Sequence, residues 1–413
     1  MPGLAARPLG ARPLAGRSGL DWAPKGRGAR PAVPGHDTGR STRRRVGVGS
    51  LRAVTLHVRI VGTGLIGTSL GIALSRAGHD VILEDPSPTA VALARDLGAG
   101  RLASQDTVPP DLVVVAAPPD VAGAVVAEEL RQWPDAVVTD VASVKVAVLE
   151  EVRAKGGDLT RYAGSHPMAG RERSGAVAAR GDLFDGRAWV VVPHTESSER
   201  AVDLVRQMAT DAGGTVSVMS PGEHDAAVAV VSHVPQVAAS LVASRLRSVS
   251  EGATALAGQG LRDVTRIAAS DPQLWTQILA GNAPAVRRVL SDLRDELGEV
   301  IRALDSLSEG EGVGAREVLA RTVAHGNTGH ARIPGKHGAP PTTYGVVTAL
   351  VPDRPGELAR LLHDVGDAGV NLEDLHLEHG LGQPFGLAEI SVLPAVAERL
   401  EQELQARGWQ LHG

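Results

Sequence analysis

The feature that most constrains the fold of this chain is a glycine-rich turn between an apolar run and a helical pattern. Gly62, Gly64 and Gly67 follow the Val- and Ile-rich residues 58–61 and open a stretch of helical periodicity that ends at Gly78. Glycines at this spacing permit a tight turn and a close backbone approach, and the N–H groups at the start of the helix attract a pyrophosphate. The context therefore predicts a dinucleotide-binding βαβ unit, with a glycine turn that serves only strand–helix packing as the alternative.

A carboxylate lies where such a unit needs one, about 20 residues beyond the glycines. The next apolar strand ends in Glu84 and Asp85, and Asp85 is predicted to accept hydrogen bonds from the adenosine ribose hydroxyls. An acidic side chain there repels a 2′-phosphate, and no Arg or Lys follows before Arg95, so the sequence favours NAD over NADP. The residues predicted to bind the cofactor are Gly62, Gly64, Leu65, Ile66, Gly67, Asp85, Ala117 and Pro118.

Beyond this unit, strand and helix patterns alternate, which is typical of an α/β protein with a parallel, doubly wound sheet. We therefore expect a Rossmann domain at residues 58–220. Its further elements are predicted as a helix at 89–97, a strand at 112–117, a helix at 121–133, strands at 136–140, 161–164 and 188–192, and a final helix and strand within 198–219.

Three further regions follow along the chain. Residues 221–307 carry Ala, Val, Leu and Arg at helical period, which predicts an all-helical domain. Residues 308–343 are rich in Gly, His and Pro and are predicted to be a linker, in which 313–324 could form one helix. Residues 344–413 are predicted to form a ferredoxin-like βαββαβ domain. Its elements are predicted as strands at 346–351, 371–378 and 387–392, helices from 357 and at 395–407, and a short final strand.

Residues 1–53 form a basic tail whose composition differs from that of the rest. The first 50 residues carry a net charge of +8, which leaves −13 for the remainder of the chain. The tail is rich in Pro, Gly and Arg and lacks apolar periodicity, so we expect it to be disordered. The alternatives are a nucleic-acid-binding arm, a targeting peptide and a start codon assigned too early. The first two are disfavoured, because the tail has neither interleaved aromatic residues nor an apolar segment.

The composition also narrows the cellular setting. The chain has no cysteine, which excludes disulfides and thiolate metal sites and favours a reducing compartment. No stretch approaches the roughly 20 uninterrupted apolar residues that a membrane helix needs. We therefore expect a cytoplasmic protein that binds no metal, no nucleic acid and no membrane.

Polar residues interrupt the apolar pattern at three places where chemistry could occur. Residues 140–145 follow a strand end, where α/β sheets bind ligands. His166 lies in a predicted loop between two glycines, where a histidine can act as a general base near neutral pH, with a surface or packing histidine as the alternative. In the helical domain, residues 232–236 and 260–275 contain polar groups. Among them, Arg266 is either a solvated arginine or a bidentate carboxylate clamp.

Five segments together resemble the prephenate and arogenate dehydrogenase family in their order and spacing. They fall within residues 58–300 and read VGTGLIGTSLG, ASVK, GSHPMAGRERSG, HD followed by SHVPQ, and GLRDVTRIAASDPQLW. Residues 344–413, with DRPGEL and GVNLED, resemble an ACT domain, a module that binds amino acids in many biosynthetic enzymes.

The resemblance implies an oxidative decarboxylation of prephenate, in which hydride leaves ring carbon C4 for NAD while the ring carboxylate departs as carbon dioxide. By the family pattern, His166 takes the proton of the 4-hydroxyl, and Ser143 shares that hydroxyl and orients the histidine. Arg266 is implied to bind a substrate carboxylate. The other residues implied at the site are His233, Gln236 and Trp275, which line the pocket, and Glu172 and Asp263, which with Arg266 resemble an ionic network that gates the site in relatives.

One departure from the family pattern bears on the substrate. Many relatives carry a second histidine where this chain has Gln236. A neutral amide can donate to the keto-acid side chain of prephenate, whereas an acidic residue would pair with the amino group of arogenate, so Gln236 favours prephenate. Arogenate stays an alternative, because glutamine can also accept a hydrogen bond from an ammonium group. Two other classes remain as well: a different Rossmann oxidoreductase, such as a hydroxy-acid dehydrogenase or a pyrroline carboxylate reductase, and a non-catalytic sensor of NAD and amino acids.

Regulation and assembly are also implied by the resemblance. An aromatic amino acid, tyrosine or phenylalanine, is expected to bind the ACT domain, where the N–H groups of a helix N-terminus can hold an α-carboxylate. A degenerate ACT domain kept only for dimer contacts is the alternative. Relatives pair their helical domains, and residues 228–246 are apolar over much of their circumference, so we expect a homodimer. The residues implied to bind the effector are Asp353, Gly356, Glu357 and Asn371.

Overall fold

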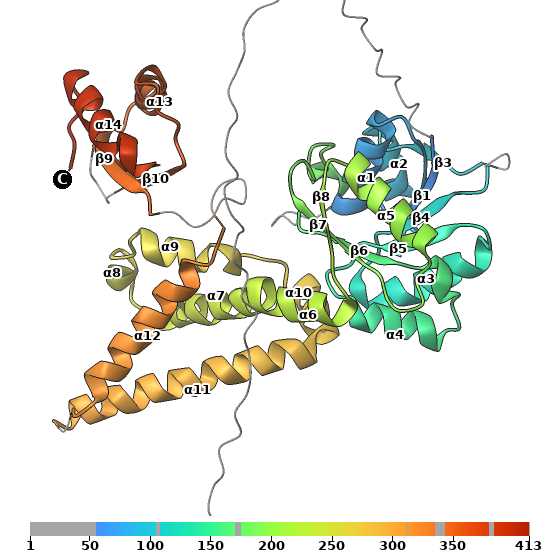
Figure 1. Ribbon diagram of the computed structural model, residues 1–413, viewed down its shortest axis with the longest axis horizontal. Helices are drawn as coiled ribbons and strands as arrows, with labels where there is room; N and C mark the ends of the chain where they lie inside the picture. The colour runs from blue at the N-terminus through green and yellow to red at the C-terminus, as the bar shows by residue number, and fades with distance from the viewer. Residues whose placement is uncertain are drawn as a thin grey trace, which may run out of the picture. The chain divides into compact units, whose positions relative to one another are not determined.

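The computed structural model describes residues 55–104, 108–169, 175–310, 312–334, 343–379 and 384–412. The expectation of a disordered tail at 1–53 lies outside these residues, as does the predicted gating residue Glu172. Figure 1 shows the described elements coloured along the chain.

The glycine-rich turn belongs to a sheet of five strands (Figure 1). Its elements are β1 (His57–Val61), α1 (Leu65–Arg76), β2 (Asp80–Glu84), α2 (Pro88–Asp96), β3 (Arg101–Leu102), β4 (Leu112–Val115), α3 (Pro119–Gln132), β5 (Val137–Asp140) and α4 (Val146–Ala154). The strands lie in the order β3-β2-β1-β4-β5, and every pair is parallel. The predicted parallel sheet is confirmed, with the short edge strand β3 as an element that the sequence did not indicate.

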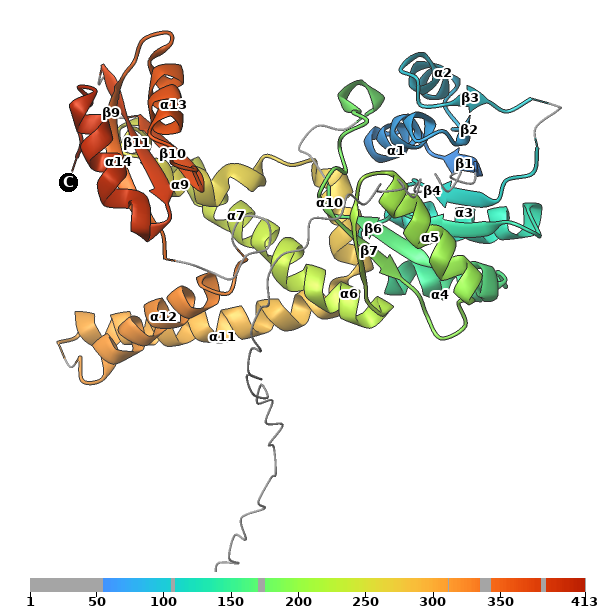
Figure 2. The same cartoon turned by 45° about the horizontal axis from the view of Figure 1, so that its top comes forward.

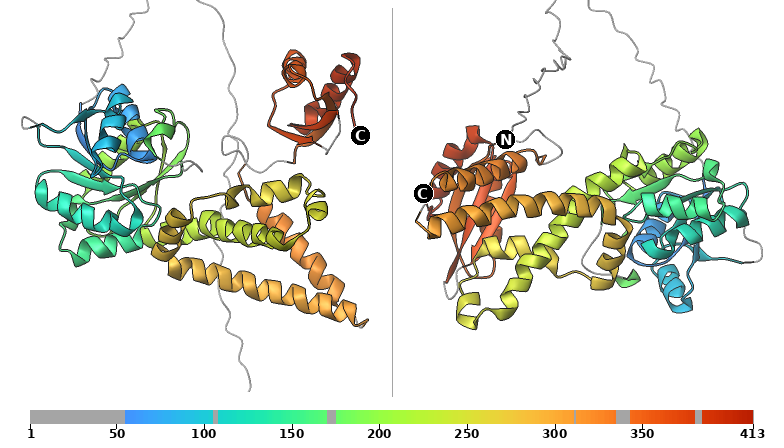
Figure 3. Two further views of the ribbon diagram at one scale, coloured as in Figure 1. Left: turned by 180° about the vertical axis from the view of Figure 1, so that it is seen from behind. Right: turned by 90° about the horizontal axis from the view of Figure 1, so that it is seen from below.

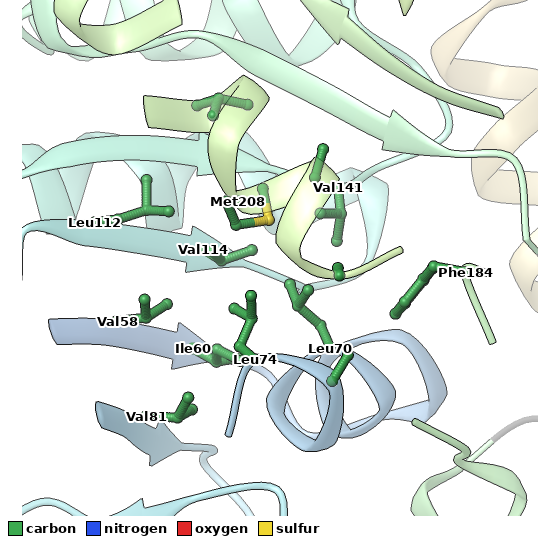
Figure 4. Close-up of a cluster of buried hydrophobic side chains, with 14 of the residues drawn as sticks. Val58, Ile60, Leu70, Leu74, Val81, Leu112, Val114, Val141, Phe184 and Met208 are labelled. Atoms are coloured by element: carbon green, nitrogen blue, oxygen red, sulfur yellow. The ribbon is translucent and has the colours of Figure 1, made fainter. Parts of the chain in front are cut away.

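Apolar side chains bury both faces of this sheet. One face is covered by α1 and α5 (Glu199–Asp211), and the other by α3 and α4. Figure 4 shows the first face, where Leu70 and Leu74 of α1 lie near Ile60 of β1, and Met208 of α5 lies near Val114 of β4. Strands buried on both sides in this way are typical of parallel sheets, which explains why their sequences read as unbroken apolar runs.

A second, three-stranded sheet stands where the sequence predicted a continuation of the first. Its strands are β6 (Gly164–Pro167), β7 (Ala188–Val192) and β8 (Thr215–Val218). β6 pairs antiparallel with β7, which pairs parallel with β8. The strand predicted at 161–164 begins only at its last residue, Gly164, because Leu159–Arg161 forms a 3-10 turn and Tyr162 makes only an isolated bridge to Val138. The Arg161 guanidinium donates to three backbone carbonyls around the end of α3, at 2.8 to 3.0 Å, and so caps that helix instead of joining a strand.

The chain beyond Pro221 folds as helices, as predicted. A continuous helical run contains α6 (Pro221–Val228), a single π turn η3 (Ala229–His233) and α7 (Val234–Arg245). Pro235 accounts for the π turn, because proline has no N–H to continue the helical bonding and its ring crowds the carbonyl four residues earlier. The next helices are α8 (Glu251–Thr254), α9 (Gln259–Thr265), α10 (Pro272–Gly281) and α11 (Ala283–Ser308).

The helical run Pro221–Ser248 is long and apolar enough to cross a membrane by length and composition, with a mean hydropathy of 1.7. The sequence analysis did not single it out, because polar residues interrupt it. Four of these, His224, Asp225, His233 and Gln236, are buried and hydrogen-bonded to other parts of the protein. Such pairing fits a helix packed within a protein.

A long helix, α12 (Ala315–His330), occupies much of the region predicted to be a linker. It extends beyond the predicted residues 313–324, and it runs back along α11 in the views of Figures 1, 2 and 3. Gly314, with φ +74, permits the reversal between the two helices. An exposed ion pair between Arg321 and Glu299 at 3.4 Å also joins them, although pairs of this kind contribute only about 1 kcal/mol or less.

The C-terminal residues form a small antiparallel sheet covered by two helices. The elements are β9 (Gly345–Pro352), α13 (Glu357–Asp367), β10 (Asp374–His379), β11 (Phe385–Val392) and α14 (Pro394–Ala406). The strands lie in the order β10-β11-β9. Val347 and Ile390 from the strands share one core with Leu361 of α13 and Leu400 of α14. The predicted final strand is reduced to a single bridge between Leu411 and Ala349.

Candidate active site

Three glycines shape the turn between β1 and α1. Gly62 has φ +103, and a Cβ there would lie 2.5 Å from the carbonyl oxygen of Ala116. A Cβ on Gly67 would lie 1.9 Å from the carbonyl oxygen of Gly62. Both positions therefore admit only glycine. Gly64 is exposed, and a Cβ there would have nothing within 4 Å, which leaves room for a pyrophosphate to approach the start of α1.

Asp85 follows β2 and is tied to the same turn. Its Oδ2 accepts hydrogen bonds from the backbone nitrogen of Thr63 at 2.7 Å and from Thr63 Oγ1 at 3.0 Å. Its Oδ1 accepts from the backbone nitrogen of Ser87 at 2.8 Å. A carboxylate offers about four acceptor positions, so one remains for a ribose hydroxyl. The predicted ribose acceptor thus lies beside the glycine turn and also fastens it.

Arg59 is a buried cation on β1 whose charge is already balanced. It pairs with Glu84, its Nε lies 3.0 Å from Oε2 of Glu129, and its guanidinium carbon lies 5.6 Å from the ring centroid of Trp133. Burial raises the pKa of the Glu129 carboxyl, and Arg59 opposes that shift. Because two carboxylates hold this guanidinium, it cannot serve as the partner of a 2′-phosphate, which fits NAD better than NADP.

The other predicted cofactor residues lie at the same edge of the sheet. Leu65 and Ile66 begin α1, while Ala117 and Pro118 follow β4. β1 and β4 are adjacent parallel strands, so the loops that follow them leave the sheet side by side. The strand order also changes direction here, since β2 lies on one side of β1 and β4 on the other. Open α/β sheets bind ligands at such a point.

His166 lies on β6, where the sequence predicted a loop. The residue pairs with Val190 of β7 and is 8% exposed. Its ring meets that of His224 edge-on, with centroids 5.1 Å apart, and Nδ1 of His166 lies 2.9 Å from Nε2 of His224. A sheet position holds the histidine more rigidly than a loop would.

His224 and Asp225, at the start of α6, extend this contact into a chain of three residues. His224 Nδ1 lies 2.8 Å from Asp225 Oδ1, and the same carboxylate accepts from the backbone nitrogens of Lys145 and Val146, each at 2.9 Å. A carboxylate can only accept, so His224 Nδ1 is the donor, and Nε2 of neutral His224 is an acceptor. His166 Nδ1 must then donate to it. The chain therefore leaves the lone pair of His166 on Nε2, as a general base requires.

The same surroundings keep His166 neutral. Burial lowers the pKa of its imidazole well below 6.5, and the nearby His224, Lys145 and His233 lower it further. A neutral imidazole with a fixed tautomer can accept a proton at physiological pH. Protonated His166 is hydrogen-bonded to His224, which is in turn hydrogen-bonded to the carboxylate of Asp225.

A buried ion pair holds β6 against the end of β5. Lys145 Nζ pairs with Asp140 and donates to the carbonyl of Ser165 at 2.7 Å, and the Tyr162 hydroxyl donates to Asp140 Oδ2 at 2.7 Å. Burial lowers the pKa of Lys145, and Asp140 opposes that shift. Removing one partner of such a buried pair costs about 3–5 kcal/mol, because the other charge is left uncompensated. The pair thus fixes the strand that carries His166.

His233 and Trp275, both predicted to line the substrate pocket, come together. His233 is 1% exposed, and its ring lies edge-on to that of Trp275, with centroids 6.1 Å apart. Gln236 lies one turn further along α7. Its amide lies 3.4 Å from Ser270 Oγ and 3.5 Å from Ser240 Oγ. The Ser270 hydroxyl donates its proton to the Ile267 carbonyl at 2.7 Å, so these contacts hold the amide in place, and an N–H of Nε2 remains for a ligand.

The remaining predicted residues, Ser143, Asp263 and Arg266, lie on neighbouring elements. Ser143 is half-buried between β5 and α4, and its side chain makes no hydrogen bond to any residue that the structure describes. Arg266 and Asp263 are exposed, and Asp263 Oδ1 accepts from Gln259 Nε2 at 2.9 Å. With Glu172 outside the described residues, the gating network of these residues stays a prediction.

Some residues that organise the site could not be assigned to it from the sequence. His224 and Asp225 belong to one of the five segments that resemble the family, and a signal for their placement exists. Ser220 and Glu223 form a capping box that starts α6, so the next two residues fall on its first turns. Asn282, at the junction of α10 and α11, gave no such signal.

The parallel sheet, its glycine turn and the buried histidine base define a nucleotide-dependent oxidoreductase. The sequence matches the family described as "Prephenate dehydrogenase, nucleotide-binding domain" over residues 70–218, and the one described as "Prephenate dehydrogenase, dimerization domain" over residues 220–319. It is 38% identical over 354 residues to the "Probable prephenate dehydrogenase NovF" of Streptomyces niveus, a match that covers 85% of this chain and 98% of that protein. The chain therefore belongs to the prephenate dehydrogenase family.

Solved structures agree with this assignment. A prephenate dehydrogenase from A. aeolicus, crystallised with hydroxyphenyl propionate and NAD+, is 28% identical with a TM-score of 0.57, over 66% of this chain and 99% of that one. The arogenate dehydrogenase of Synechocystis is 25% identical with a TM-score of 0.55, over the same shares of the two chains. The predicted family, the nucleotide-binding α/β domain and the helical domain after it are confirmed.

Proposed function

We propose that this chain catalyses the NAD-dependent oxidative decarboxylation of prephenate to 4-hydroxyphenylpyruvate in tyrosine biosynthesis. The observation that carries the proposal is the chain Asp225–His224–His166, which presents a neutral histidine with its Nε2 lone pair available. This is the arrangement that removal of a hydroxyl proton needs. Family membership and the dinucleotide turn supply the rest of the support.

The proposed chemistry balances with one substrate and one cofactor. His166 Nε2 takes the proton of the 4-hydroxyl as the C4–H bond breaks and its electron pair leaves as hydride. NAD supplies the hydride acceptor when bound to the glycine turn. The bond between the ring and its carboxylate then breaks, carbon dioxide departs, and the electron pair enters the ring, which becomes aromatic. Asp225 stabilises the imidazolium through His224 until the proton is released.

The substrate is held, in this proposal, by groups of the helical region. Arg266 binds a carboxylate of prephenate, and His233, Gln236 and Trp275 surround the ring and its side chain, while Ser143 shares the 4-hydroxyl. The remaining N–H of Gln236 Nε2 donates to the keto-acid group. Arogenate is the second candidate substrate, since a relative of this fold is named an arogenate dehydrogenase.

We also propose that the C-terminal residues form an ACT domain that binds an aromatic amino acid. With the bridge at Leu411 counted as a strand, the order of the sheet is that of a ferredoxin-like βαββαβ fold. Gly356, with φ +94, precedes the first turn of α13, where Glu357 lies. Asp353 is exposed just before this turn, and Asn371 is exposed between α13 and β10. Tyrosine titrated into the protein should release heat and inhibit turnover, and Asn371→Ala should weaken both. Inhibition unchanged in that variant would place the effector elsewhere.

A homodimer in the cytoplasm completes the proposal. The second matched family is described as a dimerization domain, and monomers rarely expose large contiguous apolar patches. Light scattering should therefore give twice the chain mass, and Leu297→Glu should reduce it. The exposed apolar side chains of α7 and α11 that support this assembly are Leu241, Val242, Leu293, Leu297, Ile301 and Leu304.

The test of the activity is NADH formation, followed by its absorbance, with prephenate and with arogenate, each with NAD and with NADP. Prephenate with NAD should give the highest kcat/KM. Calorimetric titration of NAD without substrate separates binding from turnover. Tight NAD binding with no turnover of either substrate would contradict the proposal and favour the sensor alternative.

A further inference from the structure

Asn282 links the two regions that carry the site histidines. It lies between α10 and α11 and is 3% exposed. Its Nδ2 donates to the backbone carbonyl of Asp225 at 2.7 Å and lies 3.1 Å from Nδ1 of His233. Neither the predicted site residues nor the proposed chemistry gives this amide a role.

The contact with Asp225 fixes which way the amide faces. A backbone carbonyl can only accept, so the Asn282 atom that faces it must be the nitrogen. The second N–H of the same nitrogen is then directed at His233 Nδ1, which must carry a lone pair. Neutral His233 therefore has its proton on Nε2.

This tautomer is the opposite of that of His166. The chain through His224 leaves Nε2 of His166 an acceptor, whereas Asn282 leaves Nε2 of His233 a donor. Neither Nε2 atom makes a hydrogen bond within the part of the chain that the structure describes. In the same part of the chain, the fully buried polar side-chain atoms that lack a hydrogen bond are Trp133 Nε1, Trp189 Nε1 and His194 Nε2. The Nε2 atoms of His166 and His233 lack a hydrogen bond but are not among these buried atoms. Both therefore keep some exposure and can meet a ligand.

We propose that Asn282 is a positioning residue, which holds His233 as a neutral Nε2–H donor toward a carboxylate of the substrate while His166 acts as the acceptor. The inference rests on the proposed function for the identity of the substrate. It gives two histidines in one site different tasks. One takes a proton, and the other binds an anion without itself becoming charged.

The charges around His233 agree with this assignment. Burial lowers the pKa of His233 to about 4, His224 lowers it as well, and Asp225 opposes the shift. The groups that face it are Asp225 and His224 from α6, His166 from β6, Asn282 from the junction of α10 and α11, and the neutral ring of Trp275 from α10. At neutral pH the His233 ring therefore donates through the single proton that its neutral tautomer carries on Nε2, and it does not need a second proton.

The decisive variant is Asn282→Asp, which keeps the size of the side chain and turns the donor into an acceptor. Like the control below, it also loses the bond to the Asp225 carbonyl. An ionised Asp at this position makes His233 carry its proton on Nδ1, so Nε2 meets the substrate carboxylate with a lone pair. The KM for prephenate should rise about 10-fold or more at pH 8, with kcat changed much less. Because the new carboxylate also raises the pKa of His233, lowering the pH should restore the Nε2–H and bring KM back toward the wild-type value.

The control is Asn282→Leu, which removes the donor and adds no charge. Its KM should rise less and stay independent of pH between 6 and 8. Thermal unfolding and NAD affinity, measured for both variants, report whether the fold survives. A KM for Asn282→Asp that equals that of Asn282→Leu at every pH would overturn the proposal, because a purely structural asparagine predicts that result.

The tautomer itself can be read without any substrate. Histidine side-chain ¹⁵N spectra of the wild-type protein, with the His233 signals assigned by a His233→Asn variant, should show the proton of His233 on Nε2. They should show it on Nδ1 in Asn282→Asp. A wild-type His233 with its proton on Nδ1 would overturn the inference. The spectra do not depend on turnover, so a failure of the proposed activity would leave this result standing on its own.

Discussion

Replacing His224 by leucine tests the chain that presents His166 as a base. The substitution removes the acceptor for His166 Nδ1, which lies 2.9 Å from His224 Nε2 in a buried setting. An unpaired buried N–H costs about 1–3 kcal/mol. If that cost falls on the transition state, it corresponds to a loss of about 5- to 150-fold in kcat. We expect a loss near the middle of this range, with the KM for prephenate little changed.

The pH dependence sharpens the test. His166 must be neutral to act, so activity is present above its pKa and is lost as the pH falls through it. Burial is the largest cause that lowers this pKa, and His224 is the next. His224→Leu keeps that burial, so the acid limb of kcat should stay well below pH 6.5 and the loss of kcat should persist at every pH above it. His224→Gln, whose amide oxygen can accept from His166, should recover part of the lost kcat.

A matched control exists elsewhere in the same domain. His79 is also a buried histidine paired with a carboxylate, at 3.1 Å from Asp211, and it takes no part in the site. His79→Leu should lower the melting temperature and leave kcat unchanged. The reasoning fails if His224→Leu has a wild-type melting temperature and a kcat within about twofold of wild type.

Three other substitutions test single residues. His166→Asn should lower kcat by about 10²-fold or more, measured as NADH formation, while calorimetry shows unchanged NAD affinity. Arg266→Ala should raise the KM for prephenate strongly, with Arg266→Lys rescuing only part of it because lysine lacks the planar fork; an unchanged KM would make Arg266 a solvated surface residue. Asp85→Ser should let NADP compete with NAD, and equal use of both cofactors by the wild-type enzyme would show that Asp85 does not discriminate.

The sequence predicted most of the fold because the signals were local. The glycine turn follows a strand and precedes a helix within a few residues, so its context could be checked directly. The parallel sheet followed from the alternation of short apolar runs and helical patterns. The strand predicted at 161–164 was placed three residues too early, because Arg161 is engaged with carbonyls near the end of α3, a tertiary contact that no local pattern reveals.

The site was predictable in its residues but not in its connections. His166, His233 and Trp275 were identified, yet His166 and His224 lie 58 positions apart in the sequence and meet only through packing of α6 against β6. The same holds for Asn282, which reaches Asp225 across 57 positions. Residues that act through another residue need no motif of their own, because their role depends on which neighbour the fold brings to them.

Asp225 contacts both His224 and Asn282, and replacing it by asparagine would move the protons of His224 and His166 to their other ring nitrogens. Its two carboxylate oxygens accept from the first backbone N–H groups of α4 and from His224 Nδ1. Oδ1 faces both Lys145 N–H and His224 Nδ1, and Oδ2 faces Val146 N–H, so an amide whose oxygen takes the Oδ2 place turns its nitrogen to His224 Nδ1 as a donor. His224 then carries its proton on Nε2, and His166 Nδ1 must become the acceptor. The proton of His166 moves to Nε2, where the substrate hydroxyl needs a lone pair. Asp225→Asn should therefore lower kcat by about 10²-fold or more, further than His224→Leu, although it changes only one atom. A smaller loss than that of His224→Leu would mean that the tautomer of His166 is not set through this chain.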